Sequence, residues 1–289
     1  MATAPKKKEK PYLSPTQIEM VSNCGEQYRR RYLEGDIIPP GIALIKGSAV
    51  HLGAEENFRQ KIESREDLPQ SQIVDRAVSA FEDKERAEGL FLSAEEEARG
   101  KKIVKGEGID STARLAGLYA REVAPKYQPK EVEIKQRLVL PSAKYDLLAI
   151  LDVVREDGNL LELKTGAKKK SQGDWDTSTQ LTIQAITQKA HSGKLPEKIT
   201  VEQMVDSGKS PPKLHTFETT RTAADFKPMA ARLNAITKLI TAGVFVPASP
   251  GWWGCSPKYC GYYRTCEFVN VERKAATIAT EKKAEKGSA

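Results

Sequence analysis

The segment LDVVREDGNLLELKTG (151–166) restricts the fold most, because it predicts a β-hairpin that carries charges inside its strands. Two short apolar runs flank the tripeptide EDG (156–158), which fits a three-residue hairpin loop with glycine in the left-handed position. This loop pairs Asp152 with Glu162. A two-residue loop would shift the pairing by one residue and move Asp152 to the opposite face of the hairpin.

One face of the predicted hairpin is charged. Residues i and i+2 of a strand share a face, so Glu162 and Lys164 point the same way, and the pairing adds Asp152 to them. The other face is expected to be apolar and to hold Leu151, Val153, Leu161 and Leu163. Adjacent carboxylates resist joint ionisation unless a cation lies between them, and Mg²⁺ or Mn²⁺ suits such oxygens. A structural ion-pair patch explains the same charges, so the hairpin alone leaves both interpretations open.

The rest of the chain reads as helices around a central group of strands. Ser14 is a plausible N-cap with proline at the first helical position. Helices are expected at 14–32, 47–62, 177–190 and 222–242, strands at 131–140 and 213–219, and a mostly helical charged stretch at 70–124 that the motif GEGID (106–110) breaks. This order predicts an α/β or α+β core with a helical insertion.

Length and charge limit the class of protein. A chain of 289 residues can bury one large core or two modest ones, and a net charge of +7 indicates an anionic partner. The sequence has no membrane span and no signal peptide, so a cytoplasmic protein is expected. Residues 1–10 are expected to form a disordered basic arm and 271–289 a flexible charged tail. SGKS (207–210) is no P-loop, because the earlier glycine is replaced by Gln203, and no nucleoside triphosphate site is expected.

Cysteine usage is the second strong signal. Three of the four cysteines form a C-x4-C-x5-C cluster at Cys255, Cys260 and Cys266, and the fourth is Cys24. Two disulfides are one interpretation, although a chain of this size needs no such crosslinks, and four unrelated thiols are another. Four thiolates also suit Zn²⁺ or a [4Fe–4S] cluster, and the spacing fits the paired cysteines of zinc sites badly.

These motifs together resemble the iron–sulfur form of the RecB-like PD-(D/E)XK nucleases, found in AddB, Dna2, the CRISPR-associated Cas4 proteins and phage-borne exonucleases. The resemblance covers residues 13–268. ILDVV…LLELKTG matches the nuclease motif, GSAVH the G-x-x-x-H helix, and QLTIQA the Q-x-x-x-Y motif, with Gln184 at the tyrosine position. The cysteine-bearing helix also matches, with Gly25 in place of the usual proline.

The resemblance implies a PD-(D/E)XK (restriction-endonuclease-like) α/β core, a central mixed sheet flanked by helices, with a helical insertion at about 60–128, a catalytic core at about 130–220 and a cysteine-cluster segment at 250–268. All three lie in one nuclease domain at 11–270. It also implies that one or two Mg²⁺ or Mn²⁺ ions are held by His51, Asp152, Glu162 and the backbone carbonyl of Leu163. Lys164 and Gln180 then complete the catalytic set. The four cysteines are implied to hold a structural [4Fe–4S] cluster.

The resemblance further implies that the partner is DNA and that the reaction is hydrolysis of phosphodiester bonds at DNA ends. The setting is recombination, repair or phage DNA metabolism in a bacterial or phage-infected cell, with any helicase or recombinase acting in trans. Candidate DNA contacts are Arg29, Arg30, Lys168, Lys169, Lys170 and Gln184. A flap-type endonuclease on the same fold and a non-catalytic DNA-binding module are the alternatives.

Overall fold

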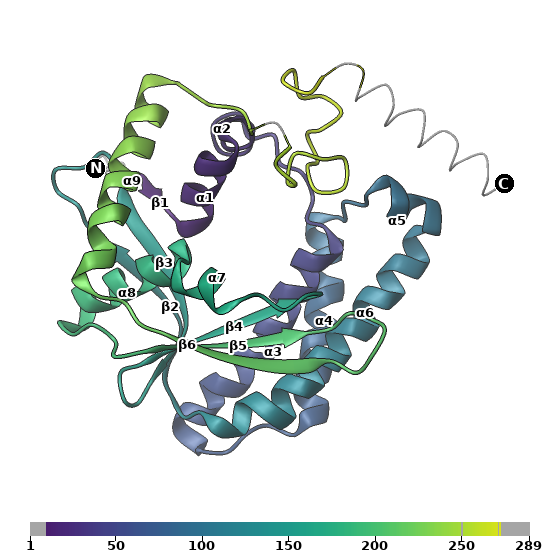
Figure 1. Ribbon diagram of the computed structural model, residues 1–289. Helices are drawn as coiled ribbons and strands as arrows, with labels where there is room; N and C mark the ends of the chain where they lie inside the picture. Colours follow the sequence, from purple (N-terminus) through teal and green to yellow (C-terminus); the bar gives the residue numbers. More distant parts are fainter. Residues whose placement is uncertain (1–9, 250, 271, 273–289) are drawn as a thin grey trace, which may run out of the picture.

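A six-stranded mixed β-sheet forms the centre of the computed structural model, which describes residues 10–249, 251–270 and 272 (Figure 1). The strands are β1 (Tyr12–Leu13), β2 (Pro129–Leu138), β3 (Asp146–Arg155), β4 (Leu160–Gly166), β5 (Ile199–Val205) and β6 (Lys213–Thr219). Their order is β1-β3-β4-β5-β6, with β2 also paired to β3. The expected α/β class with a central mixed sheet is confirmed.

Strand β3 has three neighbours. β2 runs antiparallel along one edge of β3, β1 pairs in parallel with residues 146–147, and β4 pairs antiparallel with residues 153–154. β1 and β4 therefore share the second edge, at opposite ends. Among the described strands, none pairs with the second edge between them, so this part of β3 is open to side chains from neighbouring helices.

Helices from residues 42–126 cover one face of the sheet (Figure 1). Their buried residues pack with Val132, Val153, Leu161 and Leu163 of the strands. The helical elements on this side are α3 (Ile42–Ser64), α4 (Gln70–Glu88), α5 (Ala94–Arg99), α6 (Lys101–Leu118), the π-helix η2 (Tyr119–Val123) and the 3₁₀ turn η3 (Ala124–Lys126). In the core of this layer, Phe58 and Tyr119 meet edge to face with ring centroids 5.4 Å apart.

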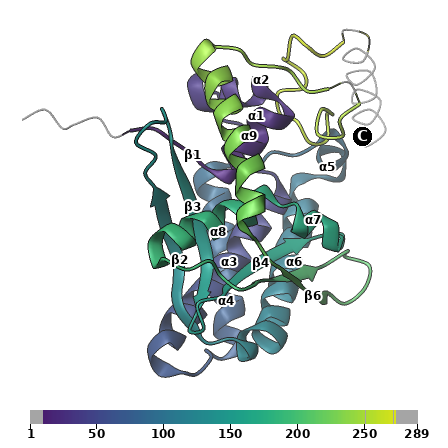
Figure 2. The ribbon, with the colours of Figure 1, turned by 60° about the vertical axis from the view of Figure 1, so that its left-hand side comes forward.

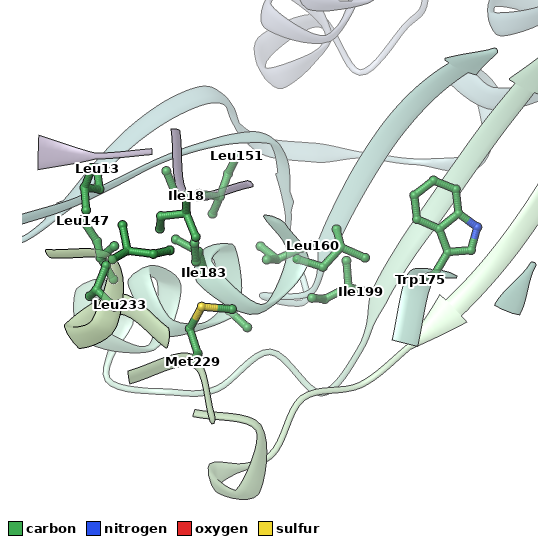
Figure 3. Close-up of a cluster of buried hydrophobic side chains, with 14 of the residues drawn as sticks. Leu13, Ile18, Leu147, Leu151, Leu160, Trp175, Ile183, Ile199, Met229 and Leu233 are labelled. Atoms are coloured by element: carbon green, nitrogen blue, oxygen red, sulfur yellow. The ribbon is translucent and has the colours of Figure 1, made fainter. Parts of the chain in front are cut away.

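The opposite face is covered by helices from both ends of the chain and by two helices from the segment between β4 and β5 (Figures 1 and 2). Leu13, Ile18, Ile183 and Leu233 join the apolar strand residues there in one cluster (Figure 3). The helical elements on this side are α1 (Pro15–Asn23), α2 (Gly25–Tyr28), the π-helix η1 (Arg29–Leu33), α7 (Gln172–Asp176), α8 (Thr179–Ser192) and α9 (Ala223–Ala242). None of the described helices is long and apolar enough to cross a membrane.

The hairpin register agrees with the sequence, but one apolar residue changes face. Val153 lies opposite Leu161, and the Arg155 N–H donates to Asn159 O at 2.9 Å, which closes the predicted three-residue loop. Leu151 was expected to share a face with Val153, yet it packs on the other side of the sheet with Leu160 (Figure 3). Strict alternation therefore fails between Leu151 and Val153.

The break in alternation is matched on β2. Its partner residue there, Glu133, has a φ of 51°, in the left-handed region that non-glycine residues rarely adopt. The pairs on either side, Val132–Val153 and Ile134–Leu151, keep one register. Glu133 and Asp152 are the two acidic residues that lie between these pairs on neighbouring strands.

Three other expectations need correction. The helix expected at 14–32 is interrupted at Cys24, whose φ of −158° and ψ of 98° are extended, although the Ser14 capping box is present. GEGID does not break the helix but lies inside α6. Gly108 of this motif allows α6 to pack closely against α4, since a Cβ at this position would lie 3.0 Å from the Phe81 ring. Strands β1 and β5 were not anticipated.

The expected basic arm and charged tail fall mostly on residues 1–9 and 273–289, which lie outside the described residues. Lys10, at the end of the expected arm, pairs with Asp146 at 2.7 Å.

Candidate active site

The Glu162–Lys164 pair of β4 forms a closed hydrogen-bonded group with the first turn of α8. Lys164 Nζ lies 2.6 Å from Glu162 Oε1 and donates to Gln180 Oε1 at 2.9 Å. Gln180 Nε2 donates in turn to Glu162 Oε1 at 2.6 Å. Burial by itself would lower the pKa of Lys164, but the carboxylates of Glu162 and Asp152 outweigh it and raise the pKa above its usual value. The lysine is therefore a fixed cation within the site.

Asp152 lies beside this group, on the neighbouring strand. Its Oδ2 accepts a hydrogen bond from the Leu163 N–H at 2.8 Å and lies 3.6 Å from His51 Nδ1 of α3. Burial, reinforced by the nearby Glu162 carboxylate, raises the pKa of Asp152 to about 6. The structure thus brings together five of the expected site residues from β3, β4, α3 and α8: His51, Asp152, Glu162, Lys164 and Gln180.

Glu133 of β2 is a member of this site that the sequence analysis missed. One ligand atom from each of His51, Glu133 and Asp152 lies within 4.8 Å of the others. Burial, followed by the charges of Asp152, Glu55 and Glu162, raises the pKa of Glu133 to about 8. The only signal in the sequence was an acidic residue inside the apolar alternation of β2.

The donor set fits a hard divalent cation. Carboxylate oxygens and an imidazole nitrogen suit Mg²⁺ and Mn²⁺. A cation would offset the burial and the mutual repulsion that together raise the two carboxyl pKa values. Asp152, Glu133 and His51 converge, whereas both oxygens of Glu162 already accept hydrogen bonds from Gln180 and Gln184. Glu162 therefore enters the site in a fixed orientation.

Gln184 of α8 is buried and connects β3 to β4. It is only 1% exposed, and its amide nitrogen donates to Glu162 Oε2 at 2.7 Å and to the Ile150 carbonyl at 2.9 Å. Ile150 lies in the part of β3 whose second edge pairs with neither β1 nor β4. The Gln184 amide therefore satisfies a backbone carbonyl that no neighbouring strand reaches. Gln184 was a candidate DNA contact, but the structure places it in the interior.

Comparison with known proteins identifies the family. The sequence model of the PD-(D/E)XK nuclease superfamily matches residues 12–267, which is most of the chain. The chain belongs to the PD-(D/E)XK nuclease superfamily. This membership implies DNA as the substrate and phosphodiester hydrolysis as the activity.

A solved structure has the same fold as this PD-(D/E)XK protein. It is the crystal structure of a candidate exonuclease from Eubacterium rectale, with a TM-score of 0.55 and 11% sequence identity over 93% of this chain and 95% of the other. At this identity the likeness concerns the fold alone. No curated protein matches the sequence.

The four cysteines of this PD-(D/E)XK chain line a single cavity. The segment 251–270, which carries the last three, lies between α2 and α5 in Figures 1 and 2. Cys24 reaches it because the chain is extended between α1 and α2. Gly25 N–H then donates to Val246 O at 2.7 Å, and a Cβ on Gly25 would lie 2.8 Å from Val246 N. Glycine thus allows the close approach of 245–246, and its N–H makes a bond that a proline lacks.

The spacing of the thiols differs from that of a zinc site. A tetrahedral zinc site with Zn–S bonds of about 2.3 Å holds its sulfurs about 3.8 Å apart. Among the described side chains, only the His51–Glu133–Asp152 group brings three ligand atoms within 4.8 Å, so no three thiols are that close. Burial raises the pKa of Cys260, and Gln27 Nε2 donates to its sulfur at 3.3 Å. The thiols are therefore more widely spaced than a tetrahedral zinc site requires.

Most of the candidate DNA contacts have partners within the protein. Arg29 binds the buried Glu26 at 2.7 Å, and Arg30 donates to Thr265 Oγ1 at 2.8 Å, which ties η1 to the cysteine segment. Lys169 lies over the Phe217 ring and Lys170 over the Trp175 ring, at 5.4 Å and 4.8 Å from the centroids. Lys168 is exposed in the loop that follows β4.

Proposed function

We propose that this chain is a divalent-metal-dependent DNA exonuclease that carries a structural [4Fe–4S] cluster. The observation that carries the proposal is the convergence of His51, Glu133 and Asp152 beside the bonded Glu162–Lys164 pair. Acidic side chains held this close in a partly buried site are destabilising without a cation. A non-catalytic DNA-binding module has no need for this arrangement.

Each residue has a chemical role in this proposal. His51, Asp152, Glu162 and the Leu163 carbonyl hold the ion, and Glu133 adds a further carboxylate. When bound, the ion supplies activation of water and neutralisation of charge on the scissile phosphate. Lys164, held by Glu162 and Gln180, orients the attacking water or stabilises the developing negative charge. Gln184 fixes the direction of the Glu162 carboxylate.

The cysteine group is assigned a structural role. A cluster on Cys24, Cys255, Cys260 and Cys266 would join the chain ends, because Cys24 lies near the start and the other three near the end of the nuclease domain. Trp253 and Tyr259, two exposed aromatic residues of the segment that carries the last three cysteines, meet edge to face with ring centroids 5.0 Å apart. Anaerobically prepared protein should be brown, with broad visible absorption. A colourless preparation with one equivalent of zinc would overturn the cluster assignment.

Action at DNA ends is the finer part of the proposal, and the fold it shares with the candidate exonuclease supports it. The protein is placed in the cytoplasm of a bacterial or phage-infected cell, in recombination, repair or phage DNA metabolism. Any helicase or recombinase acts in trans, since the sequence has no Walker A motif.

One assay tests the activity and its mode. Protein purified without oxygen is incubated with 5′- and 3′-labelled linear DNA and with circular DNA, single- and double-stranded, in Mg²⁺ or Mn²⁺. Degradation of linear DNA alone is expected, and the label that is released first gives the polarity. Cleavage of circles or at flap junctions would indicate an endonuclease, and inertness of every substrate would favour the binding module. Asp152→Ala protein is the matched control for contaminating nucleases.

A further inference from the structure

A lysine next to the catalytic strand has no part in the proposed chemistry. Lys46 lies on α3 beside Gly47, where an added Cβ would lie 3.2 Å from Thr165 Oγ1. Thr165 directly follows Lys164 in β4. Lys46 is partly buried, and burial lowers its pKa. The charge of Lys46 is therefore partly removed from water, which disfavours the ammonium form unless a partner stabilises it.

Hydrogen bonds hold the Lys46 ammonium in place. Lys46 Nζ donates to Ser111 Oγ of α6 at 3.1 Å, and Ser111 Oγ donates to Asp206 Oδ2 at 2.6 Å. Arg114, one turn further along α6, donates to the same oxygen from Nη2 at 2.8 Å and from Nε at 3.1 Å. The Asp206 N–H donates to the Gly166 carbonyl at 2.9 Å, which ties the network to the end of β4.

The charges of this network do not balance. Lys46 and Arg114 are both cationic, whereas Asp206 is the one carboxylate within it and is already paired with Arg114. No carboxylate of the described residues, Asp206 included, lies within 4.0 Å of Lys46 Nζ, which donates to the neutral hydroxyl of Ser111 instead. A cation partly removed from water is costly unless an anion pairs with it. The network therefore has one positive charge in excess, at the end of the catalytic strand.

We infer that Lys46 and Arg114 form a phosphate-binding site for the DNA strand as it passes the end of β4. The inference deepens the proposed function and rests on it. Asp206 is buried and fixes Arg114, whose side chain is 42% exposed and thus open to a ligand. The phosphodiester backbone supplies the anion that the network lacks. A purely structural role, in which Asp206 only anchors α6 to β5, is the competing explanation.

DNA binding tests the site directly. The affinity of wild-type, Lys46→Gln and Arg114→Gln proteins for labelled single- and double-stranded oligonucleotides is measured across a salt series, without divalent ions, so that nothing is cleaved. Each lost phosphate contact should lower the slope of log affinity against log salt by about 0.9 on duplex DNA or about 0.7 on single strands. Lys102→Gln, at an exposed lysine of the same helix α6, removes the same charge outside the network and should leave the slope unchanged.

A stability measurement separates the two explanations. If Lys46 serves an anion, Lys46→Gln should unfold at the same temperature as wild type or higher, and added inorganic phosphate should raise the melting temperature of wild type more than that of the variant. A lower melting temperature with an unchanged salt slope would show that the network is structural, and the inference would be wrong. Failure of the wild type to bind or cleave any DNA would instead overturn the proposed function.

Discussion

Gln184 donates to Glu162 Oε2 at 2.7 Å from a position that is 1% exposed. The same amide nitrogen donates to the Ile150 carbonyl, so one side chain joins the open edge of β3 to the Glu162 carboxylate of β4. In the family that the sequence resembles, a tyrosine stands at this position. The glutamine here is therefore a buried support of the site.

This relationship predicts the effect of Gln184→Leu. The substitution removes a hydrogen bond to a charged group and leaves the Ile150 carbonyl without its partner, which should cost about 2–3 kcal/mol of unfolding free energy. The cleavage rate should fall because Glu162 loses its fixed orientation, while DNA affinity should stay the same. Denaturant unfolding, single-turnover cleavage and DNA titration measure the three quantities. A large loss of DNA affinity in folded Gln184→Leu protein would instead indicate that Gln184 contacts DNA.

Substitution of the carboxylates tests the metal site. Asp152→Ala or Glu162→Ala should abolish cleavage and keep the fold, the cysteine-bound group and DNA binding, because each removes an anionic ligand. Lys164→Ala should lower the cleavage rate by about 10²–10³ and change metal affinity little, since an ammonium is no ligand. Cleavage rate and Mn²⁺ titration are compared for each variant, with circular dichroism and visible absorption as controls. If Asp152→Ala and Glu162→Ala both cleave DNA at the wild-type rate, the charged face of the hairpin has only a structural role.

Metal affinity should depend on pH between about 6 and 8. The pKa values of Asp152 and Glu133 are raised to about 6 and about 8, so the folded metal-free protein favours their protonated forms. The stability that this contributes is complete below the ordinary carboxyl pKa and is lost as pH rises through the raised values. Metal binding must displace these protons, so the affinity for Mn²⁺ should rise by up to about tenfold per pH unit for each proton released.

The contribution of Glu133 to this dependence can be isolated. Glu133→Gln keeps the size of the side chain and removes its titration, so the upper part of the rise, above pH 7, should disappear. Calorimetric titration of Mn²⁺ in two buffers of different ionisation enthalpy counts the protons released. The same pH profile in the variant and in wild type would exclude Glu133 from the metal site.

Gly25 provides a test of the cysteine segment. Gly25→Ala places a Cβ 2.8 Å from Val246 N, which should destabilise the protein by about 1–3 kcal/mol and reduce the iron content. Gly106→Ala is the matched control, because its Cβ meets nothing within 4 Å on an exposed turn of α6, and it should stabilise the protein by about 0.5–1 kcal/mol. Thermal unfolding and iron analysis check both variants. Equal stability of the Gly25 variant and wild type would contradict the close packing at 245–246.

The hairpin and its charged face could be predicted because turn chemistry and strand alternation are local. Glu156-Asp157-Gly158 fixed the register, and the register placed Asp152 opposite Glu162. His51 and Gln180 come from other helices, and no local pattern joins them to the hairpin. Their inclusion depended on the resemblance to a known family.

Glu133 and β5 escaped prediction for physical reasons. Glu133 enters the site through a left-handed backbone angle, which depends on tertiary packing. β5 carries Glu202 and Gln203, which look like surface residues but are buried, because Tyr127, Thr216 and the loop after β4 satisfy their polar groups. The break at Cys24 likewise depends on the distant 245–246 segment.

The hydrogen bond from the Leu163 N–H to Asp152 Oδ2 gives the nuclease a built-in spectroscopic reporter. Its acceptor is the carboxylate expected to bind the ion, so the chemical shift of this amide and its rate of exchange with solvent should respond to every ion that enters or leaves. Isotope labelling of leucine alone would make this signal visible in a protein of 289 residues. Occupancy of the site could then be followed in solution without DNA and without turnover.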